Sequence, residues 1–538
     1  MSVVTLGADA PKLSPEEIAT LSSKSGIKIK DEHVDDFARL LGALDQSVKD
    51  VLNDEDYYPK PDLDKYPRND IHVPEGPEQS DKGGWATKFT AKSVAPTGDL
   101  LKGRTVALKD NVALAGVRCT NGTAAVDWTP ELDATIATRI MDAGATITGK
   151  AACENACMEG VSDTSVTGKV HNPYADNYSC GGSSSGSGRL VATGSVDMAI
   201  GCDQGGSIRI PASMCGIVGL KPTWGLVPYT GIVSLECTID HAGPVTKTVR
   251  DCALFLEAIA GTDGIDDRQP VYLPPGTLEY TKNLDSFLSS AKDSSKPLEG
   301  VKVGILEEGF TIPNMDPNIH SICTSAVDKL KDLGATVTKI SMPSHTNAAV
   351  VWMCSMPIAG GKQGLLSDMS GRKQLYLTDR VVKSGRKLSQ EAFDKLSPGG
   401  QNLYMRHLYL DEKYGPELHA KCSNLLRKIN DEYDHALKDV DVLVMPTLPS
   451  PPCKLFEDPS AHGPLERLSR NVGLVGNTAP FNSTGHPALT IPVGFVPAQE
   501  DESVKLPAGL QIVGKKFDDI ECLKVAAAWE KAYDWKTL

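Results

Sequence analysis

Glycine is concentrated in one part of this 538-residue chain, and its distribution constrains the fold more than any other feature. Twelve of the 49 glycines lie in residues 181–231, which begin GGSSSGSG (181–188) and continue through GCDQGGSIRIP (201–211). Glycine weakens ordinary helices and strands, but it allows left-handed backbone angles and a close approach to a ligand. A flexible linker is disfavoured, because core-forming residues such as Ile210 and Ile217 follow at once. We expect a binding or catalytic loop inside a folded core.

The sequence around this segment alternates between helical patterns and apolar, β-branched stretches. Residues 133–143 have a helical pattern that ends at Gly144, and the same ending followed by a strand recurs in DLGATVT (332–338). A glycine at a left-handed helix end, followed by a β-branched strand, explains both. The predicted strands are 105–108, 145–148, 301–306 and 440–445. Helices that alternate with strands in one sheet indicate an α/β domain.

Residues 1–95 differ from this pattern and are predicted to be a helical extension with a linker. Ser14 precedes Pro15 and two glutamates, a typical helix start. A second helix is predicted for 31–52, where apolar residues repeat at helical spacing. Residues 57–84 are polar and rich in proline, which favours a linker or a wrapping arm. The predicted domains are therefore 1–95 and 96–538.

Composition excludes several classes of protein. The chain has 55 basic and 69 acidic residues and a net charge of −14, which argues against a nucleic-acid-binding role. No apolar run approaches the length of a membrane span, and the N-terminus lacks the pattern of a secretory signal. The 13 cysteines include no CxxC pair, so reduced, buried thiols in the cytoplasm are expected. No metal-ligand cluster is visible either, and we expect neither a metal nor another cofactor.

A phosphate-binding loop is one possible interpretation of the glycines. GATITGK (144–150) nearly matches such a loop. However, Ala151 stands where a serine or threonine would hold magnesium, and the motif overlaps a predicted strand instead of opening a helix.

An α/β-hydrolase is a second interpretation. GSSSG (182–186) fits the nucleophile elbow, with Ser184 as the nucleophile. A histidine in the C-terminal part of the chain would be needed, and His462 and His486 are available. Neither has a distinguishing context, and a match to this pattern is easily found in a segment so rich in glycine and serine.

A third interpretation comes from a resemblance to the amidase signature family. GGSSSGS (181–187), GCDQGGSIRIPA (201–212) and CGIVGLKPT (215–223) are similar to the family's signature. Upstream, VALKDNV (106–112) resembles the family's lysine block, at the family's spacing. Further similarity extends the resemblance from about Leu101 to the C-terminus. It implies an α/β/α sandwich with a mixed central β-sheet, to which the N-terminal helical extension is attached.

The resemblance also implies a Ser-Ser-Lys triad. Lys109 would be the base, Ser183 the bridging serine beside a cis peptide bond, and Ser207 the nucleophile. The chemistry fits these residue types, because a serine hydroxyl attacks poorly until a base removes its proton. Lysine can act as that base only when it is neutral. Burial can lower its pKa by several units from about 10.4.

Backbone donors must stabilise the oxyanion in such a mechanism. The resemblance assigns this role to Gln204, Gly205 and Gly206, where the family commonly has Thr or Ile in place of Gln204. Residues expected to support this loop are Asp203, Arg209 and Ser184. Residues suspected in the substrate pocket are Cys157, Trp352 and Phe481, together with the regions 119–128 and 477–481.

The predicted function is hydrolysis of small carboxylic amides to an acid and ammonia or an amine, through an acyl-Ser207 intermediate. A urethanase or ester hydrolase that uses the same triad is the alternative. An amidotransferase A-type subunit is disfavoured by the acidic charge and the N-terminal extension, and an intact triad disfavours a non-catalytic scaffold. The expected partner is a small amide or carbamate, and the family resemblance suggests a homodimer.

Overall fold

The computed structural model describes residues 11–270, 272–290, 295–368, 372, 375–385 and 387–538. They form two compact units, 1–59 and 60–538. The predicted boundary at residue 95 therefore lies inside the larger unit. Two strands in the predicted linker region explain the difference. β1 (Arg68–His72) pairs with β2 (Trp85–Ala91), and β2 in turn pairs with a strand of the main sheet.

The smaller unit is a pair of packed helices. Ser14 caps α1 (Pro15–Lys24) through a reciprocal capping box with Glu17, as its sequence predicts. The second predicted helix is α2 (Val34–Asn53), preceded by a short 3₁₀ turn. One face of α2 packs on α1, while a stripe of apolar residues stays at least 42% exposed: Phe37, Leu40, Leu44, Val48 and Val51.

The larger unit is built on a twelve-stranded mixed sheet with the order β1-β2-β4-β3-β5-β7-β6-β11-β12-β10-β8-β9. Its remaining strands are β3 (Thr105–Lys109), β4 (Thr146–Ala151), β5 (Met198–Asp203), β6 (Val218–Lys221), β7 (His241–Thr246), β8 (Lys302–Leu306), β9 (Thr336–Ile340), β10 (Val442–Pro446), β11 (Ala488–Pro497) and β12 (Lys505–Gly514). β3 is parallel to both β4 and β5, whereas β5 is antiparallel to β7. The four predicted strands are all present, with ends within three residues of the prediction.

The α-helices of the larger unit are α3 (Thr135–Asp142), α4 (Ser185–Thr193), α5 (Arg209–Cys215), α6 (Val249–Ile259), α7 (Tyr280–Ser290), α8 (Pro317–Asp332), α9 (Ser344–Gly360), α10 (Thr378–Ser384), α11 (Gln390–Asp394), α12 (Pro398–Asp439), α13 (Pro464–Ser469), α14 (Ala479–Thr484) and α15 (Asp519–Ala532). Gly415, with a φ of 58°, interrupts the helical backbone of α12. No helix in the described ranges is both long and apolar enough to span a bilayer.

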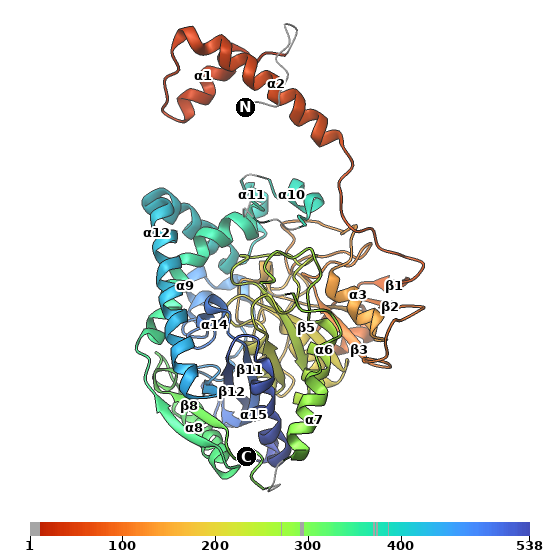
Figure 1. Ribbon diagram of the computed structural model, residues 1–538, viewed down its shortest axis with the longest axis vertical. Helices are drawn as coiled ribbons and strands as arrows, with labels where there is room; N and C mark the ends of the chain where they lie inside the picture. The colour runs from red at the N-terminus through yellow and green to blue at the C-terminus, as the bar shows by residue number, and fades with distance from the viewer. Residues whose placement is uncertain (1–10, 271, 291–294, 369–371, 373–374, 386) are drawn as a thin grey trace. The chain divides into compact units, whose positions relative to one another are not determined.

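Helices cover both faces of the sheet (Figure 1). Successive strand residues point to opposite faces, so Val106 and Leu108 pack in one apolar cluster with α3 and α6. Ala107 and Ala199 pack in a second cluster with α4 and α5. The predicted α/β/α sandwich with a mixed sheet is confirmed. Its central strands β3 and β5 end next to each other, and the candidate site lies at these ends.

Candidate active site

A lysine and a serine from separate motifs meet at the end of β3. Lys109 is the last residue of this strand and is fully buried. Its Nζ donates to Ser183 Oγ at 2.8 Å and to the carbonyl of Cys202, on β5, at 3.2 Å. The peptide bond between Gly182 and Ser183 is cis, as the resemblance implies. The predicted base and bridging serine are thus in direct hydrogen-bond contact.

Ser207 lies in the tight turn that joins β5 to α5. Its side chain is partly exposed, whereas Lys109 and Ser183 are buried. The turn leaves no room for larger residues at its two glycines. A Cβ at Gly205 would lie 2.8 Å from the Trp352 ring, and one at Gly206, whose φ is +148°, would lie 2.6 Å from the Thr478 hydroxyl. Both positions therefore require glycine.

The backbone of this turn is held by its carbonyl groups. Trp352 Nε1 donates to the carbonyl of Gln204 at 3.1 Å, and Thr478 Oγ1 donates to that of Gly205 at 2.5 Å. Within the described ranges, the amides of Gly205, Gly206 and Ser207 donate to no protein acceptor. Fixed, unpaired amides at consecutive positions are the kind of donor that stabilises an oxyanion.

A buried ion pair anchors both ends of the turn. Arg209 donates to both carboxylate oxygens of Asp203 at 3.0 Å. Its remaining donors reach the carbonyl of Thr478 and the side chains of Gln511 and Asn482, so all five N–H groups are used. Burial alone would raise the pKa of Asp203, but the Arg209 charge and these hydrogen bonds hold that pKa well below its ordinary value. Bidentate geometry of this kind fixes the backbone on both sides of Ser207.

Thiols change the protonation expected for Lys109. Burial favours its uncharged form, but neighbouring thiols, above all Cys157, outweigh this effect and raise the pKa of Lys109. A hydrogen bond from Cys153, together with the charge on Lys109, lowers the pKa of Cys157 to about 6 in spite of its burial. Burial therefore acts on the lysine pKa in the expected direction, while the neighbouring thiols, whose effect the sequence did not indicate, act in the opposite direction.

A carboxylic acid lies behind the serine loop. Glu154 is fully buried, and burial raises its pKa to about 8. It bonds the hydroxyl of Ser185 at 2.7 Å and that of Thr164 at 2.6 Å, and its own amide donates to the carbonyl of Ser183. Glu154 thus connects the first residue of α4 to the backbone of the bridging serine.

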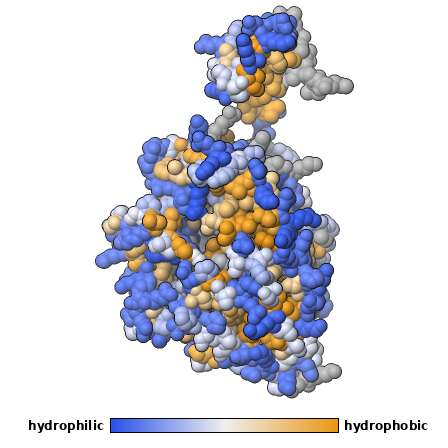
Figure 2. Space-filling model, turned by 90° about the vertical axis from the view of Figure 1, so that its left-hand side faces the viewer, coloured by the Kyte–Doolittle hydropathy of each residue, from blue (hydrophilic) through white to orange (hydrophobic). Residues whose placement is uncertain are grey.

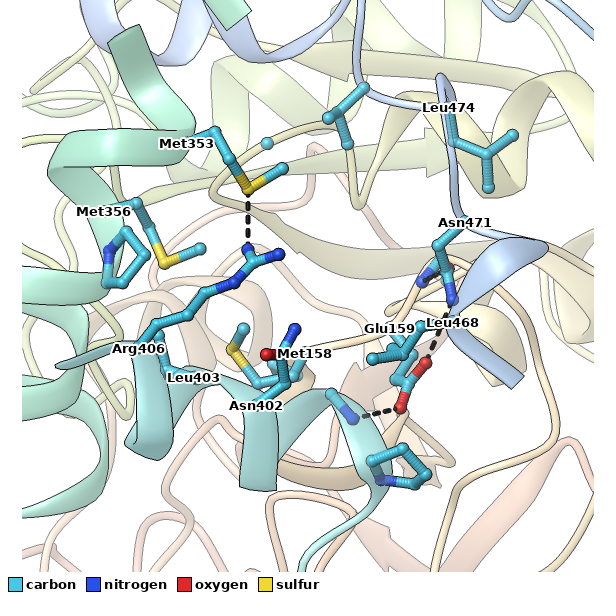
Figure 3. A pocket seen from close by; sticks show the side chains of 18 of the residues that line it. Met158, Glu159, Met353, Met356, Asn402, Leu403, Arg406, Leu468, Asn471 and Leu474 are labelled. Carbon is cyan, nitrogen blue, oxygen red and sulfur yellow. Dashed lines mark hydrogen bonds between the residues drawn. The ribbon is translucent and has the colours of Figure 1, made fainter. Parts of the chain in front are cut away.

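A cavity of about 840 Å³ opens above Ser207. Its other walls come from α9, from the first turns of α12 and from residues 464–475. Most of these side chains are apolar, and Figure 3 shows Met353, Met356, Leu403, Leu468 and Leu474 around the space. Figure 2, which faces the side of the molecule that carries α9 and α12, shows apolar residues gathered on that surface. A volume of this size is typical of a small-molecule site.

Comparison with known proteins identifies the family. A family model described as amidase matches residues 84–523 of the chain. The chain belongs to the amidase family. The chain is 39% identical over 477 residues to an enantioselective amidase of Rhodococcus rhodochrous, and the match covers 86% of this chain and 87% of that protein. The enzyme is therefore a hydrolase that acts on the carbon–nitrogen bond of amides.

Two further relatives show how widely the enzyme's fold is shared. The A-type subunit of the glutamyl-tRNA(Gln) amidotransferase of Pseudothermotoga lettingae is 32% identical over 440 residues, which cover 80% of this chain and 86% of that protein. The solved structure of native peptide amidase from Stenotrophomonas maltophilia matches with a TM-score of 0.63 and 26% identity, covering 80% of this chain and 83% of that one. The mixed sheet and its helices are thus those of known amidases.

The side chains that the nucleophile-elbow and phosphate-loop interpretations require do not come together in the enzyme. Ser184 is fully buried, and its Oγ is bonded to the backbone of Cys202. His486 bonds Asp434 and Thr484, while His462 stacks on Phe456, so neither bonds to Ser184. Lys150 lies buried in β4, where its Nζ donates to the carbonyl of Val112 instead of facing a phosphate loop.

Predictions for the pocket were partly wrong. Cys157 and Trp352 line the cavity, but Phe481 does not. Phe481 is fully buried in the main core against Tyr433 and His345, because α14 turns its aromatic ring away from the cavity. Residues 119–128 and 477–481 are absent from the cavity lining as well.

The sequence did not indicate several side chains that line the cavity. Glu159, Asn402, Arg406 and Asn471 all contribute to its walls. None of them belongs to a motif, and helical periodicity alone does not say which face of α12 meets the cavity. The only hint of these cavity residues in the sequence was a polar residue, Arg406, three positions after Leu403 on the same face of α12.

Proposed function

We propose that the enzyme hydrolyses small carboxylic amides to a carboxylic acid and ammonia or an amine through an acyl-Ser207 intermediate. The fully buried contact between Lys109 Nζ and Ser183 Oγ at 2.8 Å, next to Gly182 of the cavity lining, supports this proposal most strongly. It provides a base and a relay for Ser207, which lines the cavity and whose hydroxyl has no hydrogen-bond partner among the described residues.

In the first half of the reaction, Ser207 Oγ attacks the amide carbonyl carbon. Its proton passes through the Ser183 hydroxyl to Lys109, which must be deprotonated to accept it, so turnover proceeds in the fraction of molecules with a neutral amine. The carbonyl oxygen becomes an oxyanion. The amides of the turn at 205–207 stabilise that charge. Collapse of the intermediate breaks the C–N bond. The proton then returns from Lys109 through Ser183 to the leaving nitrogen, which leaves an acyl ester on Ser207.

In the second half, water repeats the sequence. It loses its proton through Ser183 to Lys109 while its oxygen attacks the ester. The proton returns to Ser207 Oγ as the C–O bond breaks, so the acid is released and the free serine is restored. No step requires a group outside the chain, the substrate and water.

An acyl-enzyme can be trapped directly. We expect that rapid acid quenching during turnover of a 4-nitroanilide leaves the acyl mass on Ser207. Trypsin cleaves after Lys169, Arg189 and Arg209, so Ser184 and Ser207 fall in different peptides, which mass spectrometry separates. Hydroxylamine should divert the acyl group to a hydroxamate. An acyl group on residues 170–189 would instead support the elbow serine and contradict the proposal.

We also propose that the full chain forms a homodimer through the apolar stripe of α2. Five apolar side chains that stay at least 42% exposed on one helix face are a typical contact surface for a second copy. Light scattering of the full chain is expected to give twice the monomer mass. The double variant Leu40→Glu, Leu44→Glu should give the monomer mass, with Leu100→Glu as a control on an exposed residue outside α2. A monomeric wild type contradicts this proposal.

A further inference from the structure

Among the described residues, the cavity lining contains one cation, Arg406, that has no carboxylate partner. Of the residues that line it, Glu159 and Arg406 are the charged ones. Glu159 is occupied on both oxygens, because Gly399 N donates to Oε1 at 2.8 Å and Asn471 Nδ2 donates to Oε2 at 3.1 Å. Burial also raises the pKa of this carboxyl, which weakens its negative charge.

Arg406 has only a weak partner. Its guanidinium reaches from α12 to Met353 on α9, where Nη1 donates to the thioether sulfur at 2.8 Å (Figure 3). A thioether is a poor acceptor, and within the described ranges Arg406 has no carboxylate partner. Asn402 lies one turn earlier on α12, lines the same cavity and has no hydrogen-bond partner among the described residues. Two donors on one helix face are thus available to a ligand.

Apolar side chains line the cavity that these donors share with Ser207. Trp352, Met356 and Leu403 line the same cavity, and hydrophobic burial there favours a carbon chain or ring. Arg406 lines the cavity but is itself exposed to solvent. An arginine with no carboxylate partner among the described residues can bind a ligand carboxylate in bidentate geometry.

From this arrangement we propose that Arg406, assisted by Asn402, binds a carboxylate at the far end of the substrate. The preferred substrates are primary amides whose acyl chain is an apolar spacer that ends in a carboxylate. This inference rests on the proposed amide hydrolysis and adds its substrate class. Arg406 acts here as a specificity residue and takes no part in bond breaking.

The test compares two series of substrates with the full chain. One series is the monoamides of linear α,ω-dicarboxylic acids of increasing length, and the other is the methyl-terminated alkanamides of the same lengths. At the best length, Arg406→Gln should lower kcat/KM for the monoamide by about ten- to a hundredfold, the usual range for a lost charge-assisted hydrogen bond. The methyl-terminated partner should change by less than about threefold, and Arg406→Lys should lie between.

A control variant distinguishes lost carboxylate binding from the general effect of removing a positive charge from α12. Arg427→Gln removes a charge from an exposed residue of the same helix outside the cavity lining, and it should leave both series unchanged. Equal effects of Arg406→Gln on both series, or no effect at any length, would overturn the inference. If the wild type hydrolysed neither series and formed no acyl-enzyme, the proposed function itself would fail. The two failures are therefore distinguishable.

Discussion

Ser207→Ala is expected to lower kcat/KM for amide hydrolysis by at least about 10⁴-fold, the scale of loss when a serine hydrolase loses its nucleophile. Ser184→Ala is expected to retain activity within about tenfold. Ser207 lines the cavity at the end of a turn whose amides donate to no acceptor in the part of the chain that the structure describes, whereas Ser184 Oγ is buried against the backbone of Cys202. Steady-state kinetics with a primary amide and with its 4-nitroanilide give both values.

Thermal unfolding of both variants serves as the control. Ser207 is partly exposed, so its variant should melt within a few degrees of the wild type. Ser184→Ala removes a hydrogen bond in the interior and should melt at a lower temperature. The opposite outcome, with Ser184 essential and Ser207 dispensable, would revive the nucleophile-elbow interpretation.

Lys109→Met should have the second-largest effect, a loss of about 10³-fold or more in kcat. A general base contributes up to about 10⁴-fold, and methionine fills the same volume without a basic group. Methionine leaves the Ser183 hydroxyl and the carbonyl of Cys202 without the hydrogen bonds that Lys109 donates, so some loss of stability is expected as well. Kinetics and a thermal melt, measured on the same preparation, separate lost catalysis from lost folding.

The pH profile gives an independent readout of Lys109. The base must be deprotonated, and the Cys157 thiol raises its pKa, so the acidic limb of kcat/KM should move to lower pH in Cys157→Ser. Cys453→Ser, a thiol that does not act on Lys109, is the matched control. An acidic limb that stays in place in Cys157→Ser would show that this thiol does not influence the base.

Residues that depend on local backbone geometry could be predicted from the sequence. Gly205 and Gly206 have no room for a Cβ. Any chain that forms this turn therefore needs two glycines directly before the serine, and this pattern can be seen in the sequence. Lys109 could be placed for a similar reason, because it ends a continuous buried strand. The ion pair between Asp203 and Arg209 could be predicted because the two residues flank the same short turn.

Residues that depend on distant packing could not be predicted. Phe481 resembles a pocket residue in sequence, but the position of α14 against Tyr433 sends its ring into the core. β1 escaped notice because four of its five residues are exposed, so it lacks the apolar alternation of a typical strand. Arg406 could be recognised only once α9 and α12 had been placed on either side of the cavity.

The catalytic residues and most of the cavity wall come from different parts of the chain. Lys109, Ser183 and Ser207 lie within about one hundred consecutive residues, whereas most of the cavity wall comes from residues 352–475. Trp352 is an exception, because its ring packs on Gly205 and its Nε1 bonds the carbonyl of Gln204. Sequence change elsewhere in the second part can alter which amides fit without disturbing the geometry that breaks the bond. New substrate preferences can therefore evolve, or be engineered, by exchanging residues of α9, α12 and the 464–475 segment on a constant catalytic core.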